Sequence, residues 1–75
     1  MGDRVFVDMG ACSGGPRAAM GVVRYTGGVH FASGYWIGVE LDDGRGANDG
    51  KIQGYRYFTC RMQHGVMAVP SRVIK

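Results

Sequence analysis

The 75-residue chain lacks any glycine-free run long enough for an ordinary helix. Its 14 glycines leave no uninterrupted stretch longer than residues 55–64 and 66–75. A typical α-helix has about 11–12 residues, and each interior glycine destabilises it by about 1 kcal/mol. The sequence therefore excludes a helical bundle, and with it a protein that reads DNA with a helix.

Other features are also scarce. Two cysteines, Cys12 and Cys60, are too few for a disulfide framework, so we expect a reduced intracellular protein. The chain has neither an apolar run of about 20 residues nor a signal peptide, so no membrane partner is expected. A net charge of +3 is a mild bias toward acidic partners and too weak to indicate nucleic-acid binding. The 45% hydrophobic content is enough for the core of one small domain.

What the sequence contains is a series of short β-prone runs separated by glycine-bearing turns. We expect strands at residues 4–8, 20–25, 36–41, 51–53, 55–60 and 66–69, with a last pairing at 73–74. We expect loops at residues 12–17, 29–35 and 42–50, the second of them anchored by Phe31.

The run 36–41 is the clearest strand. Ile37, Val39 and Leu41 alternate on one face, while Gly38 beside Trp36 predicts a close backbone approach or a bulge. About six short strands in a chain of this length predict an all-β fold. We expect a small closed or nearly closed β-barrel, because closure removes unpaired strand edges.

Catalytic and metal-binding constellations are weak. Cys60 and His64 lie four residues apart, but Cys60 is better explained as a small apolar residue beside Phe58. Asp42 and Asp43 are explained as turn residues. The glycine-rich stretch 44–50 has no helix after it, so it does not predict a phosphate-binding loop. We expect no enzyme, no metal site and no cofactor.

Aromatic residues flank the loop 42–50 on both sides in the sequence. They are Phe31, Tyr35, Trp36, Tyr55, Tyr57 and Phe58. Those left exposed beside the loop would form an apolar groove rimmed by amides and cations, which is typical of a peptide site. Trp36, Tyr57 and Phe58 are explained equally well as core residues.

Several fixed spacings together resemble a CAP-Gly domain over nearly the whole chain. They are Gly21-Val22-Val23-Arg24-Tyr25-x-Gly27, Phe31-Ala32-x-Gly34-x-Trp36-x-Gly38-Val39-Glu40-Leu41-Asp42, Gly46-Ala47-Asn48-Asp49-Gly50, Gly54-x-Arg56-Tyr57-Phe58-x-Cys60 and His64-Gly65. The resemblance implies a glycine-rich β-barrel of the Src-homology-3 type. It also implies that residues 1–75 are a single domain, which we expect to be one module of a longer protein.

The resemblance further implies a function. CAP-Gly domains bind acidic C-terminal tails ending in Glu-Glu-Tyr or Glu-Glu-Phe, as on α-tubulin and end-binding proteins. The expected partners are therefore such tails and microtubules, and the expected location is the cytoplasmic microtubule cytoskeleton, including plus ends.

The site residues that the resemblance implies are Phe31, Trp36, Gly46, Ala47, Asn48, Asp49, Gly50 and Met67. Phe31 and Trp36 correspond to the aromatic residues that receive the ligand's terminal ring. Asn48 is expected to bond to the terminal carboxylate or the ligand backbone, and Asp49 to order the loop. Met67 stands where the family usually has Phe, and keeps an adaptable apolar wall.

Ala47 is the main departure, because the family's signature loop has lysine at this position. Arg45, Lys51 and Arg56 are candidates for an electrostatic rim that steers the acidic residues of a ligand. Two hypotheses follow. One is a module that binds acidic, aromatic-ended tails with weakened or altered specificity. The alternative is a scaffold domain that binds an internal segment of a non-tubulin partner.

Overall fold

The computed structural model describes residues 2–8 and 18–74, which form seven β-strands and one short 3-10 helix, η1. The strands are β1 Arg4–Asp8, β2 Ala18–Gly27, β3 Trp36–Leu41, β4 Lys51–Ile52, β5 Tyr55–Arg56, β6 Gly65–Ala68 and β7 Val73–Ile74, and η1 covers Pro70–Arg72.

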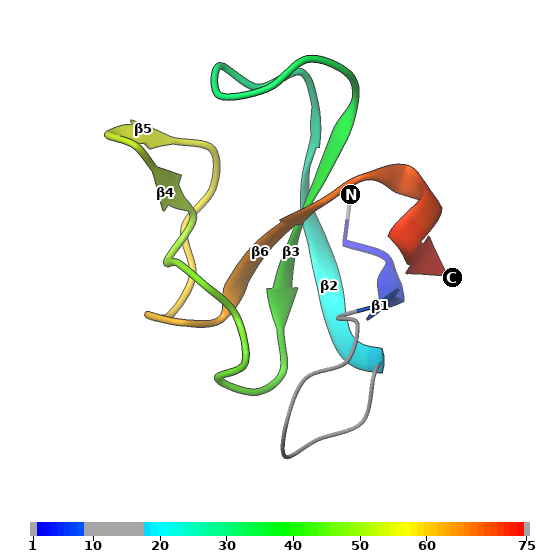
Figure 1. Ribbon diagram of the computed structural model, residues 1–75. Coiled ribbons are helices and arrows are strands. Elements are labelled where there is room, and N and C mark those ends of the chain that lie inside the picture. The colour runs from blue at the N-terminus through cyan, green and yellow to red at the C-terminus, as the bar shows by residue number, and fades with distance from the viewer. Residues whose placement is uncertain (1, 9–17, 75) are drawn as a thin grey trace.

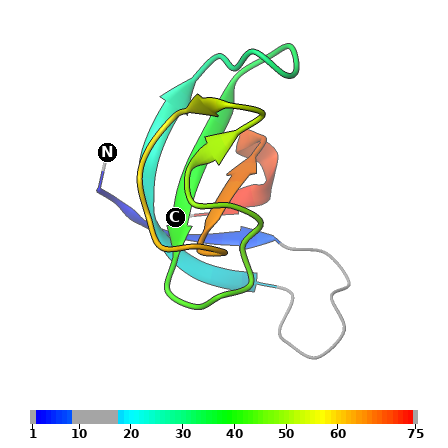
Figure 2. The ribbon, with the colours of Figure 1, turned by 90° about the vertical axis from the view of Figure 1, so that its left-hand side faces the viewer.

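The strands form two antiparallel sheets. The larger sheet has the strand order β6-β3-β2-β1-β7, and the hairpin β4–β5 forms the smaller one. Figure 1 shows this hairpin to one side of the larger sheet, and Figure 2 shows it lying over a face of that sheet. The long strand β2 pairs with both β1 and β3, and so holds the centre of the fold together.

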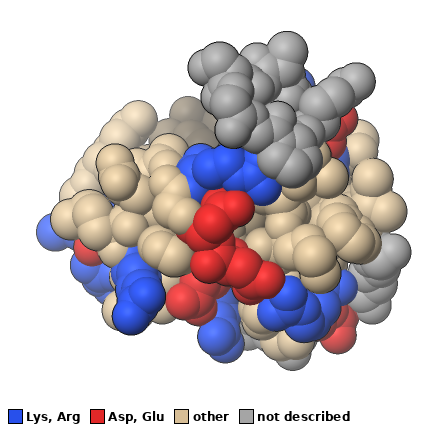
Figure 3. All heavy atoms as spheres, turned by 90° about the horizontal axis from the view of Figure 1, so that it is seen from below, with Lys and Arg blue, Asp and Glu red and all other residues tan. Residues whose placement is uncertain are grey.

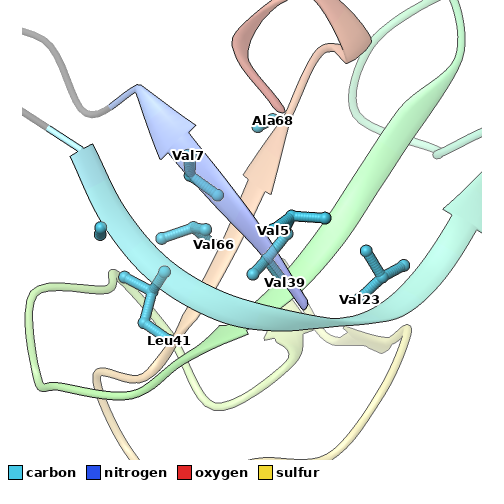
Figure 4. Close-up of a cluster of buried hydrophobic side chains, with 8 residues drawn as sticks. Val5, Val7, Val23, Val39, Leu41, Val66 and Ala68 are labelled. Atoms are coloured by element: carbon cyan, nitrogen blue, oxygen red, sulfur yellow. The ribbon is translucent and has the colours of Figure 1, made fainter. Parts of the chain in front are cut away.

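The core is built from small aliphatic side chains, mostly valine, that alternate along four strands. It consists of Val5, Val7, Ala19, Val23, Val39, Leu41, Val66 and Ala68. Figure 4 shows these side chains converging from β1, β2, β3 and β6. Val39 and Leu41 are buried and Ile37 packs against the cluster, so the predicted apolar face of the strand 36–41 is confirmed.

Gly38 lies beside a β-bulge and at a close contact, the two alternatives expected at this position. The pairing of β2 with β3 shifts register between Val23 and Tyr25, beside Gly38, which is the geometry of a β-bulge. A Cβ at Gly38 would lie 2.6 Å from the Phe58 ring. Only a residue without a side chain lets Phe58 pack there, and Phe58 is 9% exposed.

The strand bounds differ from the expected ones by one or two residues at several ends, and the largest difference lies in residues 57–60. Residues 57–60 are not a strand, because their backbone bonds to the preceding loop. The N–H groups of Tyr57 and Phe58 donate to the Gly50 carbonyl, and that of Cys60 donates to the Asp49 carbonyl. These bonds replace the ladder that the aromatic run 55–60 predicted.

The larger sheet is barrel-like but, over residues 2–8 and 18–74, is not closed by strand pairing. Among the described residues, β6 and β7 are the edges of the larger sheet and do not pair with each other. The chain between them turns through η1, where Pro70 has no N–H to donate to a ladder. The all-β, barrel-like class expected from the sequence is confirmed, with seven strands in place of about six.

The expected loop 12–17, including Cys12, lies outside the described residues. Across residues 2–8 and 18–74, no helix has the length and apolar character that crossing a membrane requires.

Candidate functional site

A groove of about 520 Å³ opens between β6, the end of β1 and the loop that follows β3. Its lining consists of Val7, Asp8, Trp36, Ala47, Val66, Met67, Ala68, Val69 and Arg72. Three of the predicted site residues, Trp36, Ala47 and Met67, therefore meet in one groove. Most of its lining is apolar, which suits a hydrophobic side chain of a ligand.

Trp36 is held in place by two contacts. Its indole N–H donates to the Ser33 carbonyl over 3.1 Å, and its ring meets Phe31 edge to face, with ring centroids 5.5 Å apart. Phe31 does not line the groove, but it packs against Trp36, which does. This contact fixes the orientation of the tryptophan, an arrangement that edge-to-face aromatic pairs favour.

The aromatic contacts continue beyond Phe31 toward the hairpin β4–β5. Tyr57 packs against Phe31, His30, Tyr25 and Tyr55, with its ring stacked on the His30 imidazole. The His30 backbone N–H donates to the Tyr57 hydroxyl over 2.8 Å. This network ties the loop 28–35 to the hairpin and supports the groove from one side.

The remaining aromatic residues of the predicted set divide between core and surface. Phe58 is buried, as the core alternative proposed, whereas Tyr35 is 55% exposed and does not line the groove.

The loop 46–50 is attached to the start of β6 by its backbone. The N–H groups of Ala47 and Asn48 both donate to the Gly65 carbonyl, and the Gly65 N–H donates to the Asn48 carbonyl. Gly46 donates to the Gln63 carbonyl over 2.7 Å. These bonds place Ala47 on the groove wall, beside the strand that carries Met67.

Asn48 and Gly50 shape the turn that follows. The Asn48 side-chain oxygen accepts a hydrogen bond of 2.9 Å from the Gly50 N–H, which forms an Asx turn. Gly50 has a φ of 99°, and a Cβ there would lie 2.0 Å from the Phe58 carbonyl oxygen. Glycine is required at this position, because both the left-handed backbone and the close approach exclude a side chain.

Asp49 orders the end of the loop. Its carboxylate accepts a hydrogen bond from the Lys51 N–H and pairs with Arg56 at 3.4 Å. The Lys51 hydrogen bond is the main cause that lowers the Asp49 pKa, and the Arg56 guanidinium lowers it further. Arg56 also donates to the carbonyls of Asp49 and Phe58, so it works as a brace for the loop.

The predicted rim cations do not line the groove. Arg45 pairs with Asp43 at 3.0 Å and also donates to the Ala18 carbonyl. Lys51 and Arg56 belong to the hairpin β4–β5. The cation in the lining is Arg72, which the sequence-based reasoning missed.

Acidic and basic side chains elsewhere on the surface largely pair with one another. Figure 3 shows one face of the molecule on which they lie side by side. Arg4 pairs with Asp42, and Arg24 pairs with Glu40 at 2.9 Å. The surface charge is therefore mixed, which does not favour binding to a polyanion such as RNA.

Cys60 and His64 do not form a nucleophile pair. The Cys60 thiol lies 3.3 Å from the Arg61 carbonyl, and burial raises its pKa. The His64 Nδ1 is hydrogen-bonded to the Leu41 carbonyl at 2.9 Å. Within residues 2–8 and 18–74, no cluster of three or more His, Cys, Asp or Glu side chains has an arrangement that could hold a metal ion.

Comparisons with known proteins agree with this architecture. The family model "CAP-Gly domain" matches residues 1–73. CAP-Gly domain-containing linker protein 3 from Mus musculus is 53% identical over 53 residues, which are 71% of this chain and 10% of that protein. Dynactin subunit 1 from Xenopus laevis is 51% identical over 53 residues, which are 71% of this chain and 4% of that protein. Microtubule-associated protein ssm4 from Schizosaccharomyces pombe is 46% identical over 61 residues, which are 79% of this chain and 9% of that protein. The chain thus spans about a tenth or less of these relatives' length.

Two solved structures share the fold. The CAP-Gly domain in human kinesin-like protein KIF13B superimposes with a TM-score of 0.80 and 43% identity, covering 99% of this chain and 66% of that one. The Bik1 CAP-Gly domain with ETF peptide from Bim1 gives a TM-score of 0.68 and 26% identity, covering 91% of this chain and 76% of that one.

Proposed function

This chain belongs to the CAP-Gly domain family, and we propose that it is a non-enzymatic module that binds acidic peptide tails with an aromatic last residue. The proposed partners are the C-terminal tails of tubulin or of microtubule end-binding proteins. The proposed location is the cytoplasmic microtubule cytoskeleton, where the relative ssm4 is named as a microtubule-associated protein. We further propose that the domain is one module of a longer protein.

The observation that carries the proposal is the open apolar groove that Trp36 shares with Met67. The T-shaped contact with Phe31 keeps the Trp36 ring oriented before a ligand arrives, so little ordering is needed on binding. An aromatic side chain buries a large apolar area, which makes it the best anchor for such a groove. The similar Bik1 domain, with its ETF peptide, supports a peptide as the occupant.

The proposed roles of the loop residues follow from their positions. Gly46 and Gly50 allow the tight approach of the loop to the neighbouring chain. The Asn48 side-chain oxygen accepts a hydrogen bond from the Gly50 N–H. The side-chain N–H₂ group is therefore the one that we propose donates to the ligand's carboxylate. Ala47 offers only a methyl group to the groove, so a tail should bind more weakly than it would with lysine there.

The test is the affinity of the purified domain for a fluorescently labelled peptide ending in Glu-Glu-Tyr, compared with the same peptide without the final tyrosine. Loss of the ring should remove about 1.5–3 kcal/mol of binding, or roughly 10-fold to 150-fold in Kd. Equal affinity for both peptides would refute the terminal-ring mechanism.

Ala47 also motivates the alternative partner, an internal segment of another protein, because position 47 lacks the lysine of the family's signature loop. A peptide that carries the same residues inside a longer chain separates the two hypotheses. The alternative predicts that this internal version binds as tightly as the free C-terminal tail.

A further inference from the structure

Arg72 stands apart from most arginines that the structure describes. Four of them, Arg4, Arg24, Arg45 and Arg56, form ion pairs within the molecule. Among residues 2–8 and 18–74, Arg61 and Arg72 have no ion pair and no side-chain hydrogen bond. Arg61 lies in a separate depression of about 330 Å³ beside His64, whereas Arg72 lines the apolar groove.

The backbone holds Arg72 at the groove. It is the last residue of η1, and its N–H donates to the Val69 carbonyl over 3.0 Å. The next residue, Val73, pairs with Val7 of β1, so Arg72 lies where the 3-10 turn enters the ladder. Both Val69 and Arg72 line the groove, which gives one wall an apolar side chain and a cation next to each other.

A guanidinium in this position suits a carboxylate ligand. Its planar set of N–H donors matches a carboxylate in two parallel hydrogen bonds, and Arg72 is exposed, so a ligand can reach its guanidinium. No partner within the described residues has to be displaced first. Asp8 is the other charged residue of the lining, so an acidic ligand gains only if its carboxylate lies closer to Arg72 than to Asp8.

We propose that Arg72 supplies the groove's cation and pairs with a carboxylate in the last residues of the bound tail, in place of the lysine that is absent at position 47. The proposal rests on the proposed function and names the residue that selects acidic ligands. Two of the rim cations that the sequence suggested, Arg45 and Arg56, are already paired with Asp43 and Asp49. Arg72 is the cation that lines the groove itself.

The test compares Arg72→Gln with a matched control, Arg61→Gln, which removes the same charge from the separate depression. Binding of the Glu-Glu-Tyr-ended peptide is measured by fluorescence anisotropy at fixed ionic strength. Arg72→Gln should weaken binding about fivefold or more, Arg72→Lys should retain part of the affinity, and Arg61→Gln should bind like the wild type. The denaturation midpoints should stay equal, because neither side chain has an ion pair or hydrogen bond with residues 2–8 or 18–74.

Two further peptides identify the carboxylate. One has a C-terminal amide and the other has both glutamates replaced by glutamine. The effect of Arg72→Gln should disappear with the peptide that lacks the carboxylate Arg72 contacts, and should persist with the other peptide.

The outcomes separate the two proposals. If the wild type binds the tail and Arg72→Gln stays within twofold of it, the inference about Arg72 is wrong while the proposed function stands. An equal loss in Arg61→Gln would also overturn it, because net charge alone would explain the effect. A loss that persists with both modified peptides would exclude carboxylate pairing. If the wild type binds none of the peptides, the proposed function fails and the role of Arg72 fails with it.

Discussion

Replacing Ala47 with lysine should tighten the binding of an acidic tail by about tenfold. Ala47 lines the groove, its side chain is exposed, and its backbone is held by the 2.8 Å hydrogen bond to the Gly65 carbonyl. A longer side chain therefore meets solvent and leaves the loop's backbone bonds intact. The new ammonium group would stand beside the groove that we propose receives the ligand.

The magnitude lies between two limits. A fully solvated ion pair contributes about 0.2–1 kcal/mol, and a charge-assisted hydrogen bond about 1.5–3 kcal/mol. Ala47 is exposed but borders the apolar side chains of Trp36 and Met67, so we expect about 1.4 kcal/mol, which is tenfold in Kd.

The assay is a titration of the labelled Glu-Glu-Tyr-ended peptide, with Ala47→Gln as a control of similar length without charge. The gain from Ala47→Lys should shrink as salt is raised, because added ions screen exposed charges. In the Arg72→Gln background, Ala47→Lys should restore much of the lost affinity. Equal binding by Ala47→Lys and Ala47→Gln would refute the reasoning, since it would mean that the loop does not face the ligand's acidic groups.

Three further predictions concern the fold. Gly50→Ala should lower the denaturation midpoint strongly, because the new Cβ would lie 2.0 Å from the Phe58 carbonyl oxygen in a left-handed backbone that alone costs about 1–2 kcal/mol; a midpoint equal to the wild type would contradict this. The pKa values of Asp43 and Asp49 lie below the ordinary 3.8, mainly through hydrogen bonds from the backbone N–H groups of Arg45 and Lys51 respectively. Their contribution to stability is therefore complete above that value and is lost as pH falls through the lowered pKa values. Thermal melts in acid should show this loss, and Asp49→Asn should show a smaller one. Cys60 should react slowly with a thiol reagent at neutral pH, because burial raises its pKa; rapid labelling of Cys60 in a folded Cys12→Ser variant would reopen a nucleophilic role.

The sequence predicted a strand best where apolar residues alternate and a glycine marks a close contact in the same run. The run 36–41 shows both, and its apolar face and the crowding at Gly38 are found as expected. The run 55–60 shows why β-propensity alone fails. Tyr57 and Phe58 are β-prone, but the N–H groups of both donate to the Gly50 carbonyl. These hydrogen bonds to the loop take the place of the strand pairing that the propensity predicts.

The candidate site was predictable where it lies within one local motif. The resemblance to CAP-Gly domains implied the loop residue Ala47 and the strand-start residue Trp36 as site residues, and both line the groove. Arg72 was not identified, because its place depends on the antiparallel pairing of Val7 with Val73, far apart in the chain. The sequence predicted a pairing at 73–74 without its partner strand, and only the register brings Arg72 to the groove.

The central claim is that the groove receives the aromatic end of an acidic tail. Its most direct test is the NMR spectrum of the ¹⁵N-labelled domain during titration with the Glu-Glu-Tyr-ended peptide. The account predicts that the largest shifts are those of the Trp36 indole N–H and of the Ala47 and Met67 amides. Largest shifts at Arg61 and His64, in the separate depression, would contradict it.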